Sequence, residues 1–348
     1  MPGPSGSAPD PATLWQRQAG LRVPQFPGPQ LPVPQLPVPL LEGRLRMVAV
    51  LITANALLRW RADLLKASGG AAADLDWLLD LEAGLAWPEL QALRLHPERE
   101  VSLRCDLTHL QSLWQRHRQQ AEPLQYLIGR CPFRQFELAV GPGVLIPRQE
   151  TELLVDLAVS LLPPSAPPAL WADLGTGSGC LAVALASAWP QARGLAVDRS
   201  PEALAQAEAN LRRAGVEGAV SLRRGSWWQP LQPWWGRLDL VVSNPPYIPS
   251  AVVDGLDPVV RLHEPRLALD GGVDGLDCLR TLLAGAASAL APGGWLLVEH
   301  HHDQSEAVLA LFAAAGLQEV CAHRDLEGRC RFVVGQRSPA HRVMPTPP

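Results

Sequence analysis

Strands and helices alternate along residues 150–336, and this alternation limits the possible folds more than any other feature of the chain. Helical spacing of apolar residues marks five segments, at 150–162, 181–189, 201–214, 276–290 and 304–315. Apolar runs typical of strands lie near 170–174, 194–198, 219–223, 238–242, 294–299, 317–323 and 330–335. The pattern predicts an α/β fold with a doubly wound sheet, whose ligands bind beyond the carboxyl ends of the strands.

A glycine-rich turn follows the first predicted strand of this sheet. Its spacing is Gly-x-Gly-x-Gly after an acid, whereas dinucleotide-binding folds carry Gly-x-Gly-x-x-Gly, and this difference favours S-adenosylmethionine over NAD. Glycines let the backbone approach a ligand, and the helix that follows offers oriented N–H groups. A generic α/β turn is the alternative. We expect cofactor contacts from Asp173, Gly175, Thr176, Gly177 and Gly179.

A second acid, Asp198, ends the next predicted strand. It follows Gly179 by nineteen residues, which is where a carboxylate can accept hydrogen bonds from both ribose hydroxyls. An ordinary turn at the end of a strand is the alternative. We predict that Asp198 binds the ribose.

The tetrapeptide Asn244-Pro245-Pro246-Tyr247 follows the apolar run at 238–242. An amide nitrogen is a poor nucleophile, so an enzyme that methylates one must hold its NH2 group with hydrogen-bond acceptors. The side-chain oxygen of Asn244 and the carbonyl of Pro245 can each accept one amino hydrogen, and Tyr247 can cover the planar group. The two prolines would fix these acceptors before substrate arrives. A Pro-rich turn is the alternative, because short motifs need structural context.

Together these motifs resemble the release-factor glutamine N5-methyltransferases, the PrmC/HemK family. The resemblance covers roughly residues 47–337, and its most discriminating part is the segment 145–152, Leu-Ile-Pro-Arg-Gln-Glu-Thr-Glu. It implies a seven-stranded, Rossmann-like methyltransferase domain preceded by a small helical bundle and a linking β-hairpin. It also implies methyl transfer from S-adenosylmethionine to the glutamine amide in the Gly-Gly-Gln motif of class I peptide-chain release factors. The matching stretches are 122–129, 144–152, 173–179, 196–198, 241–248 and 264–272.

The resemblance adds four residues to the expected site. Arg148 and Glu150 would contact substrate beside the Asn-Pro-Pro-Tyr segment, although an acid at a helix start is also explained by the helix dipole. Ser226 and Trp227 would meet the adenine, and Asn244 would contact both ligands. The family usually has an acid where this chain has Ser226, so a neutral hydroxyl should bind the adenine amino group more weakly.

The expected reaction is direct in-line transfer to the amide nitrogen, without a covalent enzyme intermediate and without a metal. Positioning supplies most of the catalysis, because the electrophile is already activated. The run His300-His301-His302-Asp303 could suggest a metal site. Adjacent residues on one extended segment rarely converge on a metal, so we expect a solvated loop there.

The chain outside the sheet divides into four further parts. Residues 1–46 are Pro-rich and predict a disordered extension, or they precede a true start at Met47. Residues 47–122 show apolar stripes, with Leu75, Leu78 and Leu79 in one of them, and predict a helical domain for substrate recognition or a stabilising cap. Residues 123–149 predict a hairpin linker with its turn at 141–143. The methyltransferase domain spans 150–337 and a disordered tail 338–348.

Composition and net charge narrow the classes of protein to which the chain can belong. The net charge of −4 gives no basic footprint, which argues against a direct nucleic-acid partner. The six cysteines form no Cys-x-x-Cys pair, which indicates reduced thiols. No apolar run matches a membrane span and no signal-peptide pattern is present. We expect a cytoplasmic protein without membrane contact, and a monomer.

Three other functions stay open from the residues alone. An amino-methyltransferase acting on adenine or cytosine would use the same Asn-Pro-Pro-Tyr chemistry on an exocyclic amine, and another protein glutamine would present the same group. A scaffold that binds S-adenosylmethionine would bind its partner without turnover. The intact segment from Asn244 to Tyr247 argues against a scaffold.

Overall fold

The computed structural model describes residues 49–163 and 165–339, which separate into two compact units. The helical unit comprises the described chain up to Ile128 together with residues 257–259. The sheet unit comprises residues 129–256 and those from 260 onward. The predictions for residues 1–46 and for most of the tail 338–348 lie outside the described residues.

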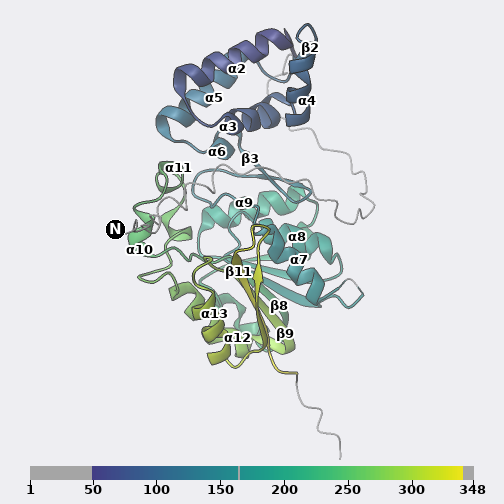
Figure 1. The fold of residues 1–348 in the computed structure, drawn as a ribbon. Coiled ribbons are helices and arrows are strands. Elements are labelled where there is room, and N and C mark those ends of the chain that lie inside the picture. The colour runs from purple at the N-terminus through teal and green to yellow at the C-terminus, as the bar shows by residue number, and fades with distance from the viewer. Residues whose placement is uncertain (1–48, 164, 340–348) are drawn as a thin grey trace, which may run out of the picture. The chain divides into compact units, whose positions relative to one another are not determined.

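The helical unit contains the expected helices and a small sheet that the sequence did not predict (Figure 1). Strands β1 (Val50–Thr53) and β2 (Glu100–Leu103) pair antiparallel. The predicted apolar stripe is in the core, since Leu75, Leu78 and Leu79 are fully buried. The helices are α2 (Ala54–Ser68), α3 (Ala72–Leu78) continued by a π-helical turn (Leu79–Ala83), α4 (Trp87–Ala92) continued by a 3-10 turn (Leu93–Leu95), α5 (Leu107–Gln120) and α6 (Leu124–Ile128).

The sheet unit is built on a mixed seven-stranded sheet in the order β10-β11-β9-β8-β5-β6-β7. The central strands run parallel, while β11 is antiparallel to both β9 and β10. This is the seven-stranded methyltransferase sheet that the sequence predicts. The strands are β5 (Leu170–Leu174), β6 (Arg193–Asp198), β7 (Val220–Arg224), β8 (Leu238–Ser243), β9 (Leu290–Glu299), β10 (Gln318–Arg324) and β11 (Cys330–Gln336).

Helices cover both faces of this sheet (Figure 1). One hydrophobic core contains α7 (Glu152–Leu161), α8 (Cys180–Ala188) and α9 (Pro201–Arg213). The other contains α12 (Asp277–Ala289) and α13 (Ser305–Ala314). All five helices occur where apolar periodicity predicts them. Shorter elements are α10 (Ser250–Val253), α11 (Pro258–Arg261) and 3-10 turns at Glu217–Ala219, Gln229–Trp234 and Arg266–Ala268.

The predicted position of the hairpin turn is wrong. Strands β3 (Arg130–Phe133) and β4 (Phe136–Ala139) pair across a turn at Arg134 and Gln135, not at 141–143. Residues 144–146, the second arm of the predicted hairpin, form no strand. The side chain of Asn210 bonds both the N–H and the carbonyl of Ala139, and the N–H of Ile146 donates to Glu264.

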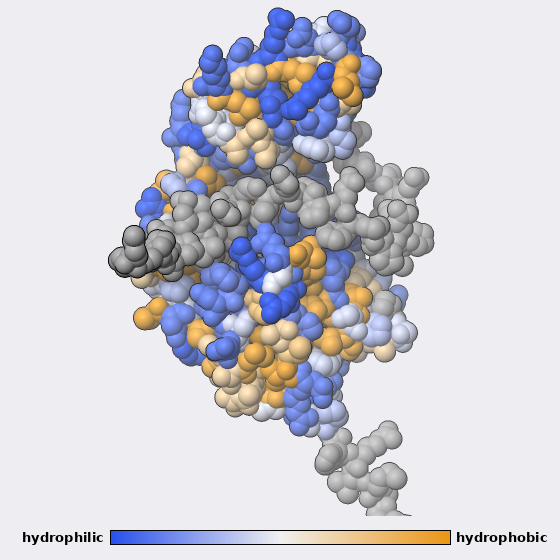
Figure 2. All heavy atoms as spheres, viewed as in Figure 1, coloured by the Kyte–Doolittle hydropathy of each residue, from blue (hydrophilic) through white to orange (hydrophobic). Residues whose placement is uncertain are grey.

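Polar and apolar side chains are interspersed on the face shown in Figure 2. Among residues 49–163 and 165–339, no helix combines the length and the apolar character that a membrane crossing requires.

Candidate active site

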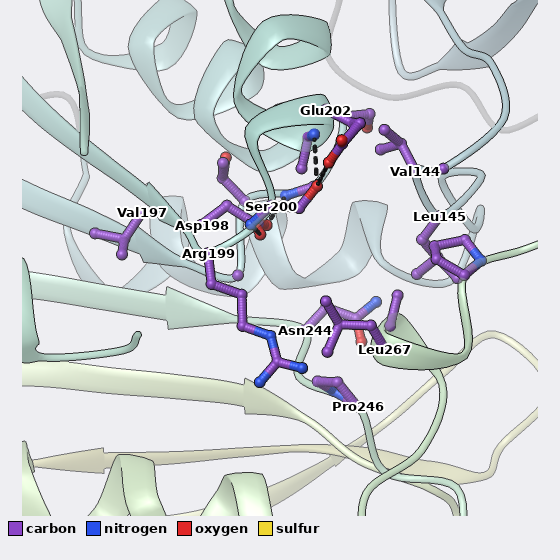
Figure 3. Close-up of a pocket in the computed structure, with 18 of the residues that line it drawn as sticks. Val144, Leu145, Val197, Asp198, Arg199, Ser200, Glu202, Asn244, Pro246 and Leu267 are labelled. Carbon is purple, nitrogen blue, oxygen red and sulfur yellow. Dashed lines mark hydrogen bonds between the residues drawn. The ribbon is translucent and has the colours of Figure 1, made fainter. Parts of the chain in front are cut away.

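A cavity of ≈ 690 Å³ lies in the sheet unit at the carboxyl ends of β5, β6 and β8 (Figure 3). Parallel strands present their loops at this edge, which is where doubly wound sheets bind ligands. The volume suits a small molecule, for which sites of roughly 300–1,000 Å³ are usual. The lining residues fall within 143–151, 175–181, 197–203, 225–227, 244–246 and 265–278.

We distinguish two halves of this cavity. The glycine-loop half consists of Gly175, Thr176, Gly177 and Asp198, and the asparagine half consists of Arg148, Thr151 and Asn244, with Glu264 and Glu299 behind them. The first half is shaped mainly by backbone, whereas side chains from distant segments form the second.

The glycine loop takes a conformation that its glycines make possible. Gly175, Gly177 and Gly179 have φ of 77°, 54° and 80°, in the left-handed region that other residues rarely adopt. The N–H groups of Gly175 and Thr176 both donate to the carbonyl of Val197. No atom lies within 4 Å of a Cβ built on Gly177, whereas one on Gly179 would lie 3.0 Å from the Cα of Ala207. Gly177 therefore leaves open space in the cavity, and Gly179 permits close packing of α8 on α9.

Asp198 is fixed by the loops on either side of it. Its Oδ2 accepts from the N–H of Gly177 at 2.9 Å, and its Oδ1 accepts from the N–H of Ser200 at 2.9 Å. The carboxylate lines the cavity, as Figure 3 shows. Arg199, which the sequence analysis did not single out, extends in that view toward the side that carries Asn244 and Pro246.

Two of the predicted cofactor residues lie beneath the cavity wall. Asp173 is fully buried and accepts a hydrogen bond from the hydroxyl of Thr176 at 2.7 Å. Burial raises the pKa of the Asp173 carboxyl to about 7. Neither Asp173 nor Gly179 is among the lining residues, so each contributes by holding the loop in shape.

Asn244 leaves the end of β8 with its side chain oriented by one hydrogen bond. Its Nδ2 donates to Thr151 Oγ1 at 2.9 Å. Among the described residues, none donates a hydrogen bond to Asn244 Oδ1, so this acceptor is available on the cavity side. Pro246 also lines the cavity, whereas Pro245 and Tyr247 do not. The hydroxyl of Tyr247 donates instead to Glu299 Oε1 at 3.1 Å.

Thr151 and Glu299 are site residues that the sequence analysis missed. Both are buried, and the hydroxyl of Thr151 donates to Glu299 Oε2 at 2.7 Å. Burial raises the pKa of the Glu299 carboxyl to about 7. A signal for each was present, since Thr151 belongs to the discriminating segment 145–152 and Glu299 ends a strand as Asp198 does.

An ion pair between the partly exposed Arg148 and the buried Glu264 supports the rim of the asparagine half. Arg148 lines the cavity, and its Nη2 lies 2.6 Å from Glu264 Oε1. The other oxygen of Glu264 accepts from the N–H of Ile146 at 3.1 Å. Glu264 was not predicted as a site residue, although it opens the matching stretch 264–272. Glu150 is half-buried and does not line the cavity.

The predicted adenine contacts, Ser226 and Trp227, both line the cavity. Trp227 has a φ of 48°, which is unusual for a bulky residue and directs its ring toward the glycine loop. A Cβ built on Gly175 would lie 3.4 Å from that ring. A Cβ at this position would therefore be in van der Waals contact with Trp227.

The prediction that the run from His300 to Asp303 forms a solvated loop is wrong for its first two residues, whereas Asp303 is exposed. His300 is fully buried and His301 is nearly so. The N–H of His300 donates to the carbonyl of Arg331, which extends the pairing of β9 with β11. Burial lowers the pKa of the His300 imidazole. Within residues 49–163 and 165–339, no group of histidine, cysteine and acidic side chains has the arrangement of a metal site.

Sheet order, glycine loop and cavity together define an S-adenosylmethionine-dependent methyltransferase. A family model described as "Methyltransferase small domain" matches residues 152–255. A release factor glutamine methyltransferase of Prochlorococcus marinus is 50% identical over 286 residues, 82% of this chain and 97% of that protein. One of Thermosynechococcus vestitus is 43% identical over 264 residues, 76% of this chain and 90% of that protein.

Among solved structures, a release-factor-specific protein-(glutamine-N5) methyltransferase from Alicyclobacillus acidocaldarius is 31% identical. The match covers 58% of this chain and 100% of that one, with a TM-score of 0.35. The sequence relatives establish the family on their own, since they are alike over most of both chains. This chain belongs to the release factor glutamine methyltransferases.

Proposed function

We propose that this protein transfers the methyl group of S-adenosylmethionine to N5 of the glutamine side chain in the Gly-Gly-Gln motif of class I release factors. Family membership supports this proposal. Within the site, one observation carries it: Asn244 uses its Nδ2 on Thr151, and its Oδ1 acceptor stays available in the cavity. An amide NH2 group, which has two hydrogens to donate, is the complement of such an acceptor.

The glycine-loop half fits the cofactor. Gly177 has open space where a side chain would stand, and Asp198 presents its carboxylate for the ribose hydroxyls. Ser226 and Trp227 would contact the adenine, and Asp173, Thr176 and Gly179 would keep the loop in shape. The bound cofactor supplies an activated methyl group attached to a sulfonium.

The asparagine half would hold the glutamine amide. Asn244 Oδ1 accepts one amino hydrogen in the cavity, and the carbonyl of Pro245 is the expected second acceptor, although Pro245 does not line the cavity in the structure. Acceptors for both hydrogens would aim the nitrogen lone pair at the methyl group. Orientation of this kind is worth up to about 7–11 kcal/mol in favourable intramolecular cases. No strong base is needed, because the amide proton leaves after nitrogen has become positively charged. Arg148 and Pro246 would contact the substrate at the rim, and Tyr247 and Glu150 would support it from behind.

The remaining assignments concern the rest of the chain. We assign release-factor recognition to the helical domain, residues 47–122, and transfer to the methyltransferase domain, residues 150–337. Residues 123–149 link the two. The protein would be a monomer, and it would bind the release factor in the cytoplasm. A helical domain that only stabilises the fold would leave release-factor affinity unchanged when its exposed residues are substituted.

Labelled S-adenosylmethionine tests the proposal directly. The protein is incubated with a class I release factor, beside a copy in which the Gly-Gly-Gln glutamine is changed to alanine, and the label is located by peptide mass. The expected result is label on that glutamine in the first factor and none in the second. Label on another glutamine, on added nucleic acid, or nowhere would overturn the proposal.

A further inference from the structure

Asn244 is useful as an acceptor only in one of its two amide orientations. A carboxamide turned by 180° would present Nδ2 to the cavity, and Nδ2 only donates hydrogen bonds. Two donors, the enzyme amide and the substrate amide, would then face each other. The site therefore needs a group that decides which end of Asn244 points inward.

A chain of three hydrogen bonds determines the orientation of the Asn244 side chain. Asn244 Nδ2 donates to Thr151 Oγ1 at 2.9 Å, Thr151 Oγ1 donates to Glu299 Oε2 at 2.7 Å, and Tyr247 OH donates to Glu299 Oε1 at 3.1 Å. A hydroxyl has one hydrogen to give. Since Thr151 gives its hydrogen to Glu299, it can only accept from Asn244, and Asn244 must offer Nδ2.

The fold brings these groups together from distant parts of the chain. Ser243 pairs with Val298 in the parallel register of β8 and β9, so Asn244 and Glu299 stand next to each other at the edge of the sheet. Thr151 directly precedes α7, which packs against β9. Thr151 and Glu299 are each 1% exposed, so water does not compete for their hydrogen bonds.

We propose that Glu299, acting through Thr151, is a positioning residue that holds Asn244 with its oxygen toward the substrate amide. This inference rests on the proposed function, because it assigns the orientation of the acceptor in that reaction. Ionised Glu299 accepts from both hydroxyls and permits one orientation of Asn244. Glu299 protonated on Oε2 donates to Thr151 instead, which frees the hydrogen of Thr151 and permits both orientations.

The surroundings of Glu299 place the protonation of its carboxylate near neutral pH. Burial raises the pKa of its carboxyl to about 7, the hydroxyls of Thr151 and Tyr247 lower that pKa, Glu150 raises it, and Arg331 lowers it. Arg331 is itself paired with Asp325. Activity should consequently fall as the pH drops through about 7, when Glu299 takes up its proton.

The test compares methyl transfer to a release factor by four variants. Thr151→Val removes the hydroxyl at nearly constant volume and should lower kcat about tenfold, the kinetic equivalent of one hydrogen bond. Thr151→Ser keeps the hydroxyl and should restore most of the rate. Glu299→Gln should lower kcat similarly and flatten the acidic side of the pH profile. Thr281→Val makes the same change on α12, where the hydroxyl bonds only the carbonyl of Asp277, and should leave kcat unchanged.

Cofactor affinity, release-factor KM and thermal unfolding are measured beside the rates. Unchanged affinity and KM with lower kcat identify loss of orientation rather than loss of fold. The inference is overturned if Thr151→Val and Glu299→Gln keep both the rate and the pH profile of the unaltered protein. It is also overturned if Thr151→Ser is as slow as Thr151→Val. If the unaltered protein itself does not label the glutamine, the proposed function fails instead, and the two failures are thus distinct.

Discussion

The two halves of the cavity are built from contacts of very different range along the chain. In the glycine-loop half, Thr176 bonds Asp173 across 3 residues and Gly177 bonds Asp198 across 21. In the asparagine half, Asn244 bonds Thr151 across 93 residues and Thr151 bonds Glu299 across 148. Local contacts can be recognised as a motif, whereas distant contacts depend on how the whole sheet unit packs. Substitutions in the two halves should therefore affect different properties of the protein.

The largest expected effect is on the stability of the asparagine half. Glu264→Ala leaves the guanidinium of Arg148 and the N–H of Ile146 without their buried acceptor. The free energy of unfolding should fall by about 3 kcal/mol, the lower end for a broken buried pair, because Arg148 is partly exposed. Urea unfolding measures this loss.

The matched control is Glu208→Ala, which breaks the exposed pair with Arg212 on α9. Solvent screens that pair, so the change should stay within about 0.5 kcal/mol. Equal losses in the two variants would mean that the buried pair does not hold this half together.

Asp198→Ala should act on cofactor binding. The variant loses the proposed ribose contact and the acceptor of two backbone N–H groups, from Gly177 and Ser200. Hydrogen bonds to a charged group are worth about 1.5–3 kcal/mol, so affinity for S-adenosylmethionine should fall roughly 10- to 100-fold. Titration calorimetry measures the affinity. At a saturating concentration of cofactor, kcat should be nearly normal. A low kcat with normal affinity for S-adenosylmethionine would contradict the assignment of Asp198 to the glycine-loop half.

Within the glycine loop, two alanine substitutions should differ. Gly179→Ala adds a Cβ at 3.0 Å from the backbone of α9 at a positive φ, and should cost about 2 kcal/mol of stability. Gly177→Ala meets no atom within 4 Å and should cost about 1 kcal/mol, from backbone strain alone. Chemical denaturation ranks the two. The opposite ranking would contradict the packing assigned to Gly179.

The last prediction concerns the slope of stability against pH. The Glu299 pKa lies near 7 in the folded protein, against an ordinary value of 4.5. Between these values the folded state keeps a proton that the unfolded chain has released, so stability falls as pH rises through this window. The slope from one such group stays below about 1.4 kcal/mol per pH unit. Glu299→Gln should remove this contribution, as urea unfolding at several pH values would show, and an unchanged slope would contradict the assignment.

The sequence predicted the sheet unit well, because its signals are local. Strand β5 begins and ends at the predicted residues, Leu170 and Leu174, since an apolar run before a glycine turn can be read in one window. The turn of the β3–β4 hairpin was misplaced, because the glycines at 141 and 143 gave a stronger turn signal than Arg134 and Gln135. The strand pair β1 and β2 was missed, because each strand is only 4 residues long.

The site was predicted in part for the same reason. Asn244 follows β8 and Asp198 ends β6, so each could be recognised from its own segment, and both line the cavity. Thr151 and Glu299 become partners only when α7 packs against β9, which no local pattern shows. The histidine run looked polar and exposed, yet His300 is buried because the strand pairing continues past Glu299.

The central claim is that Asn244 holds the substrate amide through its side-chain oxygen. Single-turnover methyl transfer tests it most directly: the unaltered protein and Asn244→Ala are each loaded with S-adenosylmethionine and then mixed with a class I release factor at saturating concentration. We expect both proteins to bind the release factor with similar affinity, and the transfer step of Asn244→Ala to be slower by about 10²-fold or more, as when a preorganised polar contact is removed from an active site. An unchanged transfer rate in Asn244→Ala would contradict the account.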